Sequence, residues 1–103
     1  MTYLRELNKL ERYLKEHGIK YERIDNENEY DALGYILTLE RHQIIVPSNT
    51  EERKWDAICH YGSYGHEDGL LEIMGDLVTK EDGDSVVGFL TADDVIMRIE
   101  GKK

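Results

Sequence analysis

Residues 54–61 have the sequence KWDAICHY, whose side chains fall into two alternating sets. One face of an extended chain would carry Trp55, Ala57, Cys59 and Tyr61. The opposite face would carry Asp56, Ile58 and His60. This period of two predicts a β-strand whose aromatic and apolar face packs in the core.

Extended segments are predicted on both sides of this strand. They cover residues 19–24, 35–39, 41–46, 70–74, 76–79 and 85–90. The polar residues 25–34 predict a loop, and residues 80–84, KEDGD, predict a hairpin turn between the last two segments. Because the connections are short, parallel crossovers have no room and the pairing is expected to be antiparallel.

Helical patterns close the chain at both ends. Near the N-terminus, Tyr3, Leu7, Leu10 and Leu14 recur at helical spacing. Near the C-terminus, Thr91 and Asp94 form a capping-box pattern ahead of an apolar stripe. We therefore expect a single α+β domain over residues 1–103. Its curved, mostly antiparallel sheet of four to six strands would be flanked by an N-terminal and a short C-terminal helix.

Acidic side chains dominate the charge of the chain. Its 103 residues include 22 acidic and 13 basic ones, for a net charge of −9, while residues 1–20 alone carry +2. Such a charge argues against direct binding of nucleic acid or of an anionic membrane, and favours a basic protein as partner. The single cysteine and the lack of a signal sequence or long apolar run predict a cytoplasmic protein.

Tyrosines and glycines accompany the acidic clusters. Residues 59–69, CHYGSYGHEDG, combine tight-turn glycines with tyrosines of the kind enriched at interfaces, and predict a recognition loop. Carboxylates also cluster at residues 27–31 and 82–84. The predicted partner-binding residues are Glu27, Glu29, Tyr30, Asp31, Tyr61, Tyr64, Glu67, Asp68, Asp82 and Asp84.

Two alternatives stay open beside this acidic surface. Asp56, His60 and His66 could serve a small metal-dependent nuclease or hydrolase, since imidazole and carboxylate suit Zn²⁺, Mn²⁺ or Mg²⁺. Exposed strand edges could instead pair between copies in a homodimer or larger oligomer. No zinc-protease or paired-cysteine motif is present, so the sequence predicts no catalytic residue, metal or cofactor.

Three segments resemble short proteins of phages and mobile elements in Gram-positive bacteria. They are residues 41–47 (RHQIIVP), 54–65 (KWDAICHYGSYG) and 88–95 (GFLTADDV). Some short acidic proteins of that setting are type II-A anti-CRISPR proteins, to which this chain is similar in size and charge. The resemblance implies an inhibitor that acts in the bacterial host cell. It would bind a CRISPR–Cas effector nuclease, whose basic channels hold guide RNA and DNA.

Overall fold

A computed structural model describes residues 4–27, 29–38, 40–60 and 63–101. Its helices are α1 (Arg5–Glu16) and α2 (Ala92–Ile99), with short 3₁₀ turns η1 (His66–Asp68) and η2 (Lys80–Asp82). The main sheet contains β1 (Glu22–Asn26), β4 (Arg41–Val46), β5 (Trp55–Ile58), β6 (Leu71–Gly75) and β7 (Val86–Leu90). A separate hairpin contains β2 (Glu29–Tyr30) and β3 (Ile36–Thr38).

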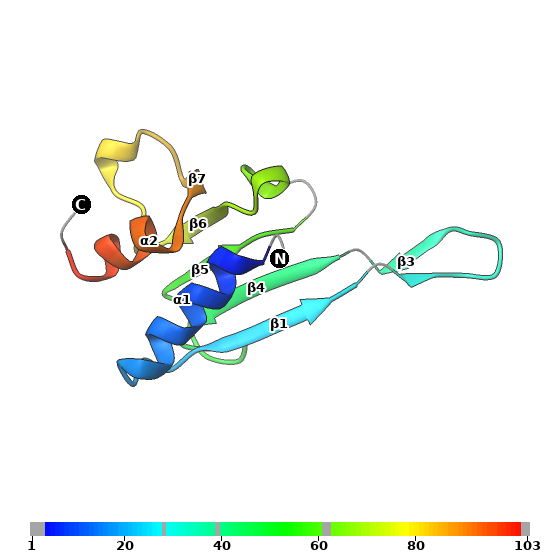
Figure 1. Cartoon of the computed structure of the whole chain (residues 1–103), viewed down its shortest axis with the longest axis horizontal. Helices are drawn as coiled ribbons and strands as arrows, with labels where there is room; N and C mark the ends of the chain where they lie inside the picture. Colours follow the sequence, from blue (N-terminus) through cyan, green and yellow to red (C-terminus); the bar gives the residue numbers. More distant parts are fainter. Residues whose placement is uncertain (1–3, 28, 39, 61–62, 102–103) are drawn as a thin grey trace.

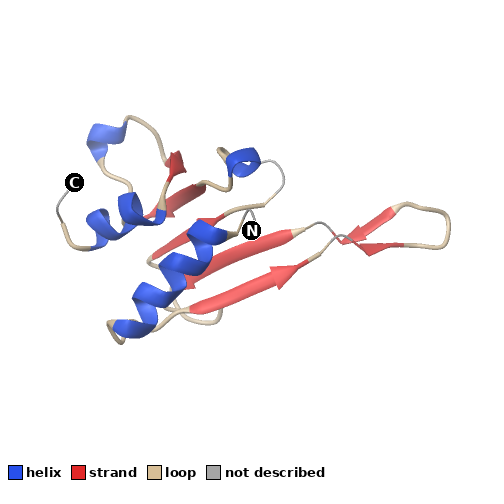
Figure 2. Cartoon of the chain, in the orientation of Figure 1, coloured by secondary structure: helices blue, strands red, loops and turns tan. Residues whose placement is uncertain are grey.

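The main sheet is antiparallel throughout, in the order β1-β4-β5-β6-β7. Both helices pack on the same face of it (Figure 1). Figure 2 shows helices (blue) packed against the strands (red) of this open sheet. The predicted α+β class, with its two terminal helices, is confirmed.

The alternation predicted for residues 54–61 places the core. Ile44 lies opposite Ala57 and Val46 lies opposite Trp55, so these side chains share the face under the helices. That face and the helices together bury Leu7, Leu10, Leu14, Ile44, Val46, Trp55, Ala57, Cys59, Leu71, Ile73, Ala92 and Val95. Removal of this apolar surface from water is the main driving force for folding.

The C-terminal helix begins as the sequence predicted. The Thr91 side chain accepts a hydrogen bond from the Asp94 amide, and the Asp94 carboxylate accepts one from the Thr91 amide. This reciprocal pair satisfies amide donors that have no partner within the helix.

The hairpin β2–β3 projects beyond the rest of the molecule (Figure 1) and contributes to its 49 Å long axis. It continues the register of the β1–β4 pair. Asn26 lies opposite Arg41, and three residues further along each strand Glu29 lies opposite Thr38. The pair β2–β3 therefore keeps the register of the pair β1–β4, and the described residues Glu27 and Glu40 lie between the two pairs, outside any strand.

Several predicted boundaries are wrong. Of the strand predicted at 54–61, the described residues form only Trp55–Ile58. The first strand covers residues 22–26 and not 19–24, because its pairing with β4 selects the later residues. The predicted loop at 25–34 contains the end of β1 and all of β2, since Asp31 closes a hairpin turn by accepting the Leu33 and Tyr35 amides.

Residues 76–79 do not form the strand that was predicted before the 80–84 turn. The chain bends at Gly75, whose φ of 102° ends β6, and the Val78 amide donates back to the Gly75 carbonyl. The 3₁₀ turn η2 follows, and Arg98 of α2 holds it through the Leu77 carbonyl and the Asp82 carboxylate. Strand β6 therefore pairs with β7 across a longer connection than a tight hairpin.

Candidate functional site

The glycine-rich loop forms a compact turn between β5 and β6. Its 3₁₀ turn η1 lies between Gly65 and Gly69, which have φ values of 91° and 72°. The Leu70 amide donates to the Gly65 carbonyl over 2.9 Å. From the neighbouring strand β6, Glu72 accepts the Tyr64 amide over 2.9 Å. The loop is therefore held by main-chain hydrogen bonds and by the Glu72 carboxylate, while Tyr64, Glu67 and Asp68 are exposed.

The loop packs against the edge strand β7 at a point that requires glycine. A Cβ atom at Gly88 would lie 2.2 Å from Tyr64 Cβ, and one at Gly65 would lie 3.1 Å from Phe89 Cα. A glycine within a strand commonly marks such a close approach of another segment. The Phe89 amide donates to the Tyr64 carbonyl over 3.3 Å, which ties the loop to the edge of the sheet.

Two aromatic rings stand exposed at this junction. Tyr64 is 59% exposed and Phe89 is 63% exposed. Their rings are stacked, with centroids 6.3 Å apart and planes 20° apart. Phe89 also adopts a φ of 60°, a left-handed conformation that is costly for a residue with a side chain. A strained backbone that presents an exposed ring is typical of a binding site.

A pocket of about 420 Å³ lies beside the rings, lined by Ser63, Tyr64, Gly65, His66, Glu67, Asp68 and Phe89. Among the described residues, the carboxylates of Glu67 and Asp68 make no hydrogen bond or ion pair, and both residues are exposed. The site therefore presents a flat aromatic surface next to two unpaired negative charges. A cationic side chain could lie against the rings and neutralise these carboxylates.

The predicted residues of the hairpin lie apart from this pocket (Figure 1). Tyr30 is exposed, whereas the Asp31 carboxylate is occupied by the Leu33 and Tyr35 amides. Glu27 lies at the base of the hairpin, and Glu29 belongs to β2, although its side chain falls outside the described residues.

In the third acidic cluster, the carboxylates of Asp82 and Asp84 both accept hydrogen bonds from residues of the same chain. The Asp82 carboxylate accepts two hydrogen bonds of 2.9 Å from Arg98, and these bonds hold the pKa of that carboxyl well below its usual range. The exposed Asp84 carboxylate accepts the Ser85 amide. Tyr61 lies outside the described residues. Of the ten predicted residues, the structure therefore brings Tyr64, Glu67 and Asp68 together.

The alternative trio of Asp56, His60 and His66 does not assemble within the described part of the chain. Asp56 is buried and accepts hydrogen bonds from Gln43 and Arg53. His60 Nδ1 accepts the His42 amide, and burial lowers the pKa of His60. His66 Nε2 lies 3.7 Å from a Glu40 oxygen. Each of the three side chains therefore contacts different residues, and they do not converge on a common metal position.

Cys59 is a core residue, as the alternation predicts. It is fully buried, and burial together with the nearby Glu40 charge raises the pKa of its thiol to about 11. A thiol with that pKa stays protonated at neutral pH and is a poor nucleophile.

Three residues were not predicted from the sequence to belong to a site. Phe89 was assigned to a strand, and only the preceding Gly88 indicated that another segment approaches there. His42 and Glu40 were not singled out as a pair, yet the Nε2 of His42 lies 3.2 Å from a Glu40 oxygen.

Comparisons of the chain with protein-family models, with curated proteins and with solved structures found no match. Neither α1 nor α2, the two helices of the described segments, is long and apolar enough to cross a membrane.

Proposed function

We propose that this protein is a non-enzymatic inhibitor that binds a basic nucleic-acid-binding protein through the Tyr64–Phe89 pocket. One observation carries the proposal: two stacked, exposed rings lie beside the Glu67 and Asp68 carboxylates, which have no partner among the described residues. Aromatic residues that anchor an interface contribute most of its binding energy. The carboxylates select a positively charged partner.

An arginine of the partner fits this site best. The guanidinium group stacks on aromatic rings and also makes bidentate hydrogen bonds to carboxylates. Both features are present within one pocket, whose lining includes the Tyr64 and Phe89 rings and the Glu67 and Asp68 carboxylates. Proteins that hold nucleic acid expose such arginines in their binding channels.

The protein's overall charge supports the same class of partner. A net charge of −9 steers the chain toward a basic surface and repels the nucleic acid that would compete for it. The hairpin offers a second contact, because Tyr30, Leu33 and Tyr35 are exposed along it. We infer that the partner is a type II CRISPR–Cas effector nuclease, and that occupancy of its channel blocks guide RNA or DNA.

Pairing between copies is a weaker alternative. The hydrogen bond from the Phe89 amide to the Tyr64 carbonyl occupies the outer edge of β7 at that position. A second copy could not add a strand there without displacing the loop.

Biolayer interferometry with immobilised protein tests the proposal. The analytes are a type II effector nuclease, with and without guide RNA, and other basic nucleic-acid-binding proteins. We expect Tyr64→Ala to weaken binding by a factor of roughly 30, and Glu67→Lys with Asp68→Lys to weaken it further at low salt.

The matched control is Glu52→Lys with Asp76→Lys, which makes the same charge change at two exposed positions outside the pocket. If this control weakens binding as much as the pocket variant does, net charge and not the pocket governs recognition. If no basic protein binds, the proposed function is wrong.

A further inference from the structure

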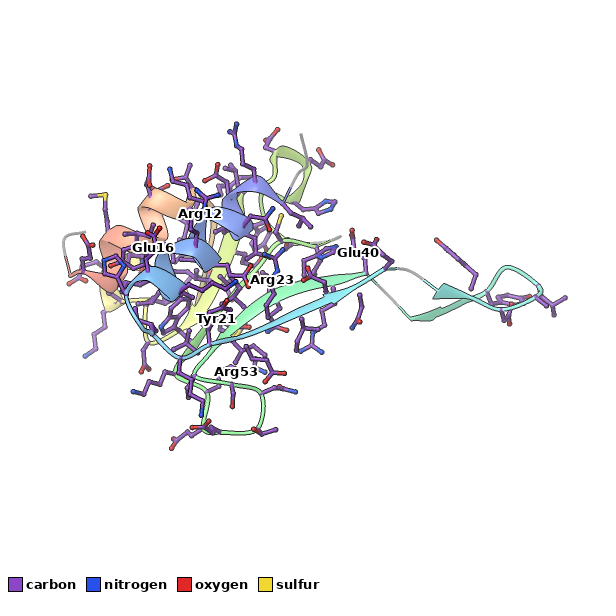
Figure 3. All side chains as sticks on the ribbon, turned by 60° about the horizontal axis from the view of Figure 1, so that its bottom comes forward. Arg12, Glu16, Tyr21, Arg23, Glu40 and Arg53 are labelled. Atoms are coloured by element: carbon purple, nitrogen blue, oxygen red, sulfur yellow. The ribbon has the colours of Figure 1, made fainter. Side chains whose placement is uncertain are left out.

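A second cluster of polar side chains lies where the hairpin leaves the sheet, and it centres on a buried histidine. His42 is 2% exposed, and its two ring nitrogens face carboxylates from different segments. Nδ1 lies 2.7 Å from Asp25 of β1. Nε2 lies 3.2 Å from Glu40, just before β4, and 3.8 Å from Glu27, just after β1. Figure 3 shows Glu40 at the junction of the sheet and the hairpin.

The contact with Asp25 determines what Nε2 can do. An ionised carboxylate only accepts hydrogen bonds, so Nδ1 must donate its proton to Asp25. In a neutral imidazole the other nitrogen then carries a lone pair. That lone pair faces the oxygens of Glu27 and Glu40, which are also acceptors. A positive charge placed between these three atoms, whether a proton or a metal ion, is stabilised by both carboxylates.

The spacing of the three atoms suits a metal ion. His42 Nε2 and one carboxylate oxygen each of Glu27 and Glu40 all lie within 4.8 Å of one another. Ligands bound tetrahedrally to Zn²⁺ at about 2.1 Å are separated by about 3.4 Å. The distances of 3.2 and 3.8 Å from Nε2 lie on either side of that value.

We propose that Glu27, Glu40 and His42 bind a divalent transition-metal ion, Zn²⁺ or Mn²⁺. One imidazole with two carboxylates favours these ions over Ca²⁺, which prefers an all-oxygen set. The Glu27 side chain is 81% exposed, so the ion can enter from solvent and retain water as a further ligand.

Outer partners already orient two of the three ligands. Asp25 holds His42 through Nδ1, and His66 Nε2 lies 3.7 Å from the second oxygen of Glu40. Carboxylate–histidine–metal arrangements of this kind recur around protein-bound metals. Arg23 donates hydrogen bonds to Asp25 and offsets the charge of that carboxylate.

A metal at this place would join the two chain segments at the base of the hairpin. Glu27 follows β1 and Glu40 precedes β4, so the ion would cross-link these two segments between the pairs β1–β4 and β2–β3. This inference does not depend on the proposed function, because it concerns different residues and a different ligand.

Isothermal titration calorimetry of the chelator-treated full chain with Zn²⁺, and the visible absorption of the Co²⁺ complex, test the site. We expect one ion per chain and a higher midpoint of thermal unfolding with metal. Glu27→Gln and Glu40→Gln should each weaken binding at least about tenfold, and Asp25→Asn should weaken it by about 10 to 100-fold.

Two controls make the result specific. Glu52→Gln removes an exposed carboxylate elsewhere, and His17→Gln removes an exposed histidine at the C-terminal end of α1; neither should change the affinity. Because His42→Gln alters a buried residue and could unfold the chain, the exposed Glu27 carries the test. The proposal is overturned if Zn²⁺, Co²⁺ and Mn²⁺ show no saturable binding at millimolar concentration, which would mean that a proton occupies Nε2. It is equally overturned if Glu27→Gln and Glu40→Gln leave the affinity unchanged.

Discussion

The main-chain amide of Phe89 donates a hydrogen bond to the carbonyl of Tyr64, 3.3 Å away, and the two side-chain rings stack above this link. A loop residue and an edge-strand residue are thereby fixed relative to each other. The pocket depends on this link, because its lining comes from the loop on one side and from β7 on the other.

Two replacements of Phe89, by glycine and by alanine, separate the free-energy cost of its backbone conformation from the contribution of its ring to binding. Its φ of 60° disfavours any residue with a Cβ atom, so Phe89→Gly should be more stable than Phe89→Ala by about 1 kcal/mol. Both variants lose the ring and should bind the partner equally weakly. Urea unfolding measures the difference in stability, and interferometry measures partner binding. If the two variants are equally stable, the backbone at Phe89 is not strained.

Gly88→Ala should displace the loop from β7. The new Cβ atom would meet Tyr64 Cβ at 2.2 Å, and relief of that overlap should cost about 1–3 kcal/mol of unfolding free energy. The control is Gly83→Ala, which has a φ of 73° but no atom within 4 Å. The control should lose stability through backbone strain alone and keep partner binding. If Gly88→Ala binds the partner as tightly as the unchanged protein, the close packing of the loop on β7 is not needed for binding.

Cys59 should resist thiol reagents in the folded protein. Burial and the Glu40 charge raise the pKa of the thiol to about 11, so little thiolate exists at neutral pH and no reagent can reach it. Labelling with iodoacetamide should be slow in buffer and fast in concentrated urea. Equal rates in the two solutions would contradict a core position for Cys59.

The Asp82–Arg98 pair should make stability depend on pH in acid. Hydrogen bonds from Arg98 lower the pKa of Asp82 below its unfolded value of about 3.9. The folded state therefore binds the proton more weakly than the unfolded state. Stabilisation by the pair is complete above about pH 4 and is lost as the pH falls through the folded pKa.

Thermal unfolding of Asp82→Asn, with Asp84→Asn as the matched control, measures this contribution. The midpoint of Asp82→Asn should lie below that of the unchanged protein at neutral pH, and the gap should narrow toward about pH 2. Asp84→Asn should change the midpoint little, because its carboxylate accepts only the Ser85 amide. If the difference in midpoint between Asp82→Asn and the unchanged protein does not vary with pH, the Asp82–Arg98 ion pair does not contribute to the stability of the fold.

Sequence patterns predicted correctly the elements that are stabilised by interactions between residues close together in the chain. The capping box of Thr91 and Asp94 and the positions of Trp55 and Ala57 on the core-facing side of β5 both appear in the structure. The strand predicted at 76–79 failed because a distant residue, Arg98, holds that segment through the Leu77 carbonyl. No pattern within the segment could indicate this contact.

The candidate site shows the same division. Tyr64, Glu67 and Asp68 are close in sequence, so one loop brings them together and the sequence could suggest them. Phe89 and the His42 cluster depend on which strands become neighbours. Their roles therefore became visible only once β7 and β1 had been placed.

The shared register of β1–β4 and β2–β3 has a consequence for how the chain folds. We expect the tip at residues 31–35 to close first, because Asp31 accepts the Leu33 and Tyr35 amides and the loop to be closed is short. Pairing can then spread from the tip, through Glu29 opposite Thr38, to Asn26 opposite Arg41. Strand β4 would then pair with β1 from the tip downward, without a search over an open loop, and we expect this part of the sheet to fold quickly.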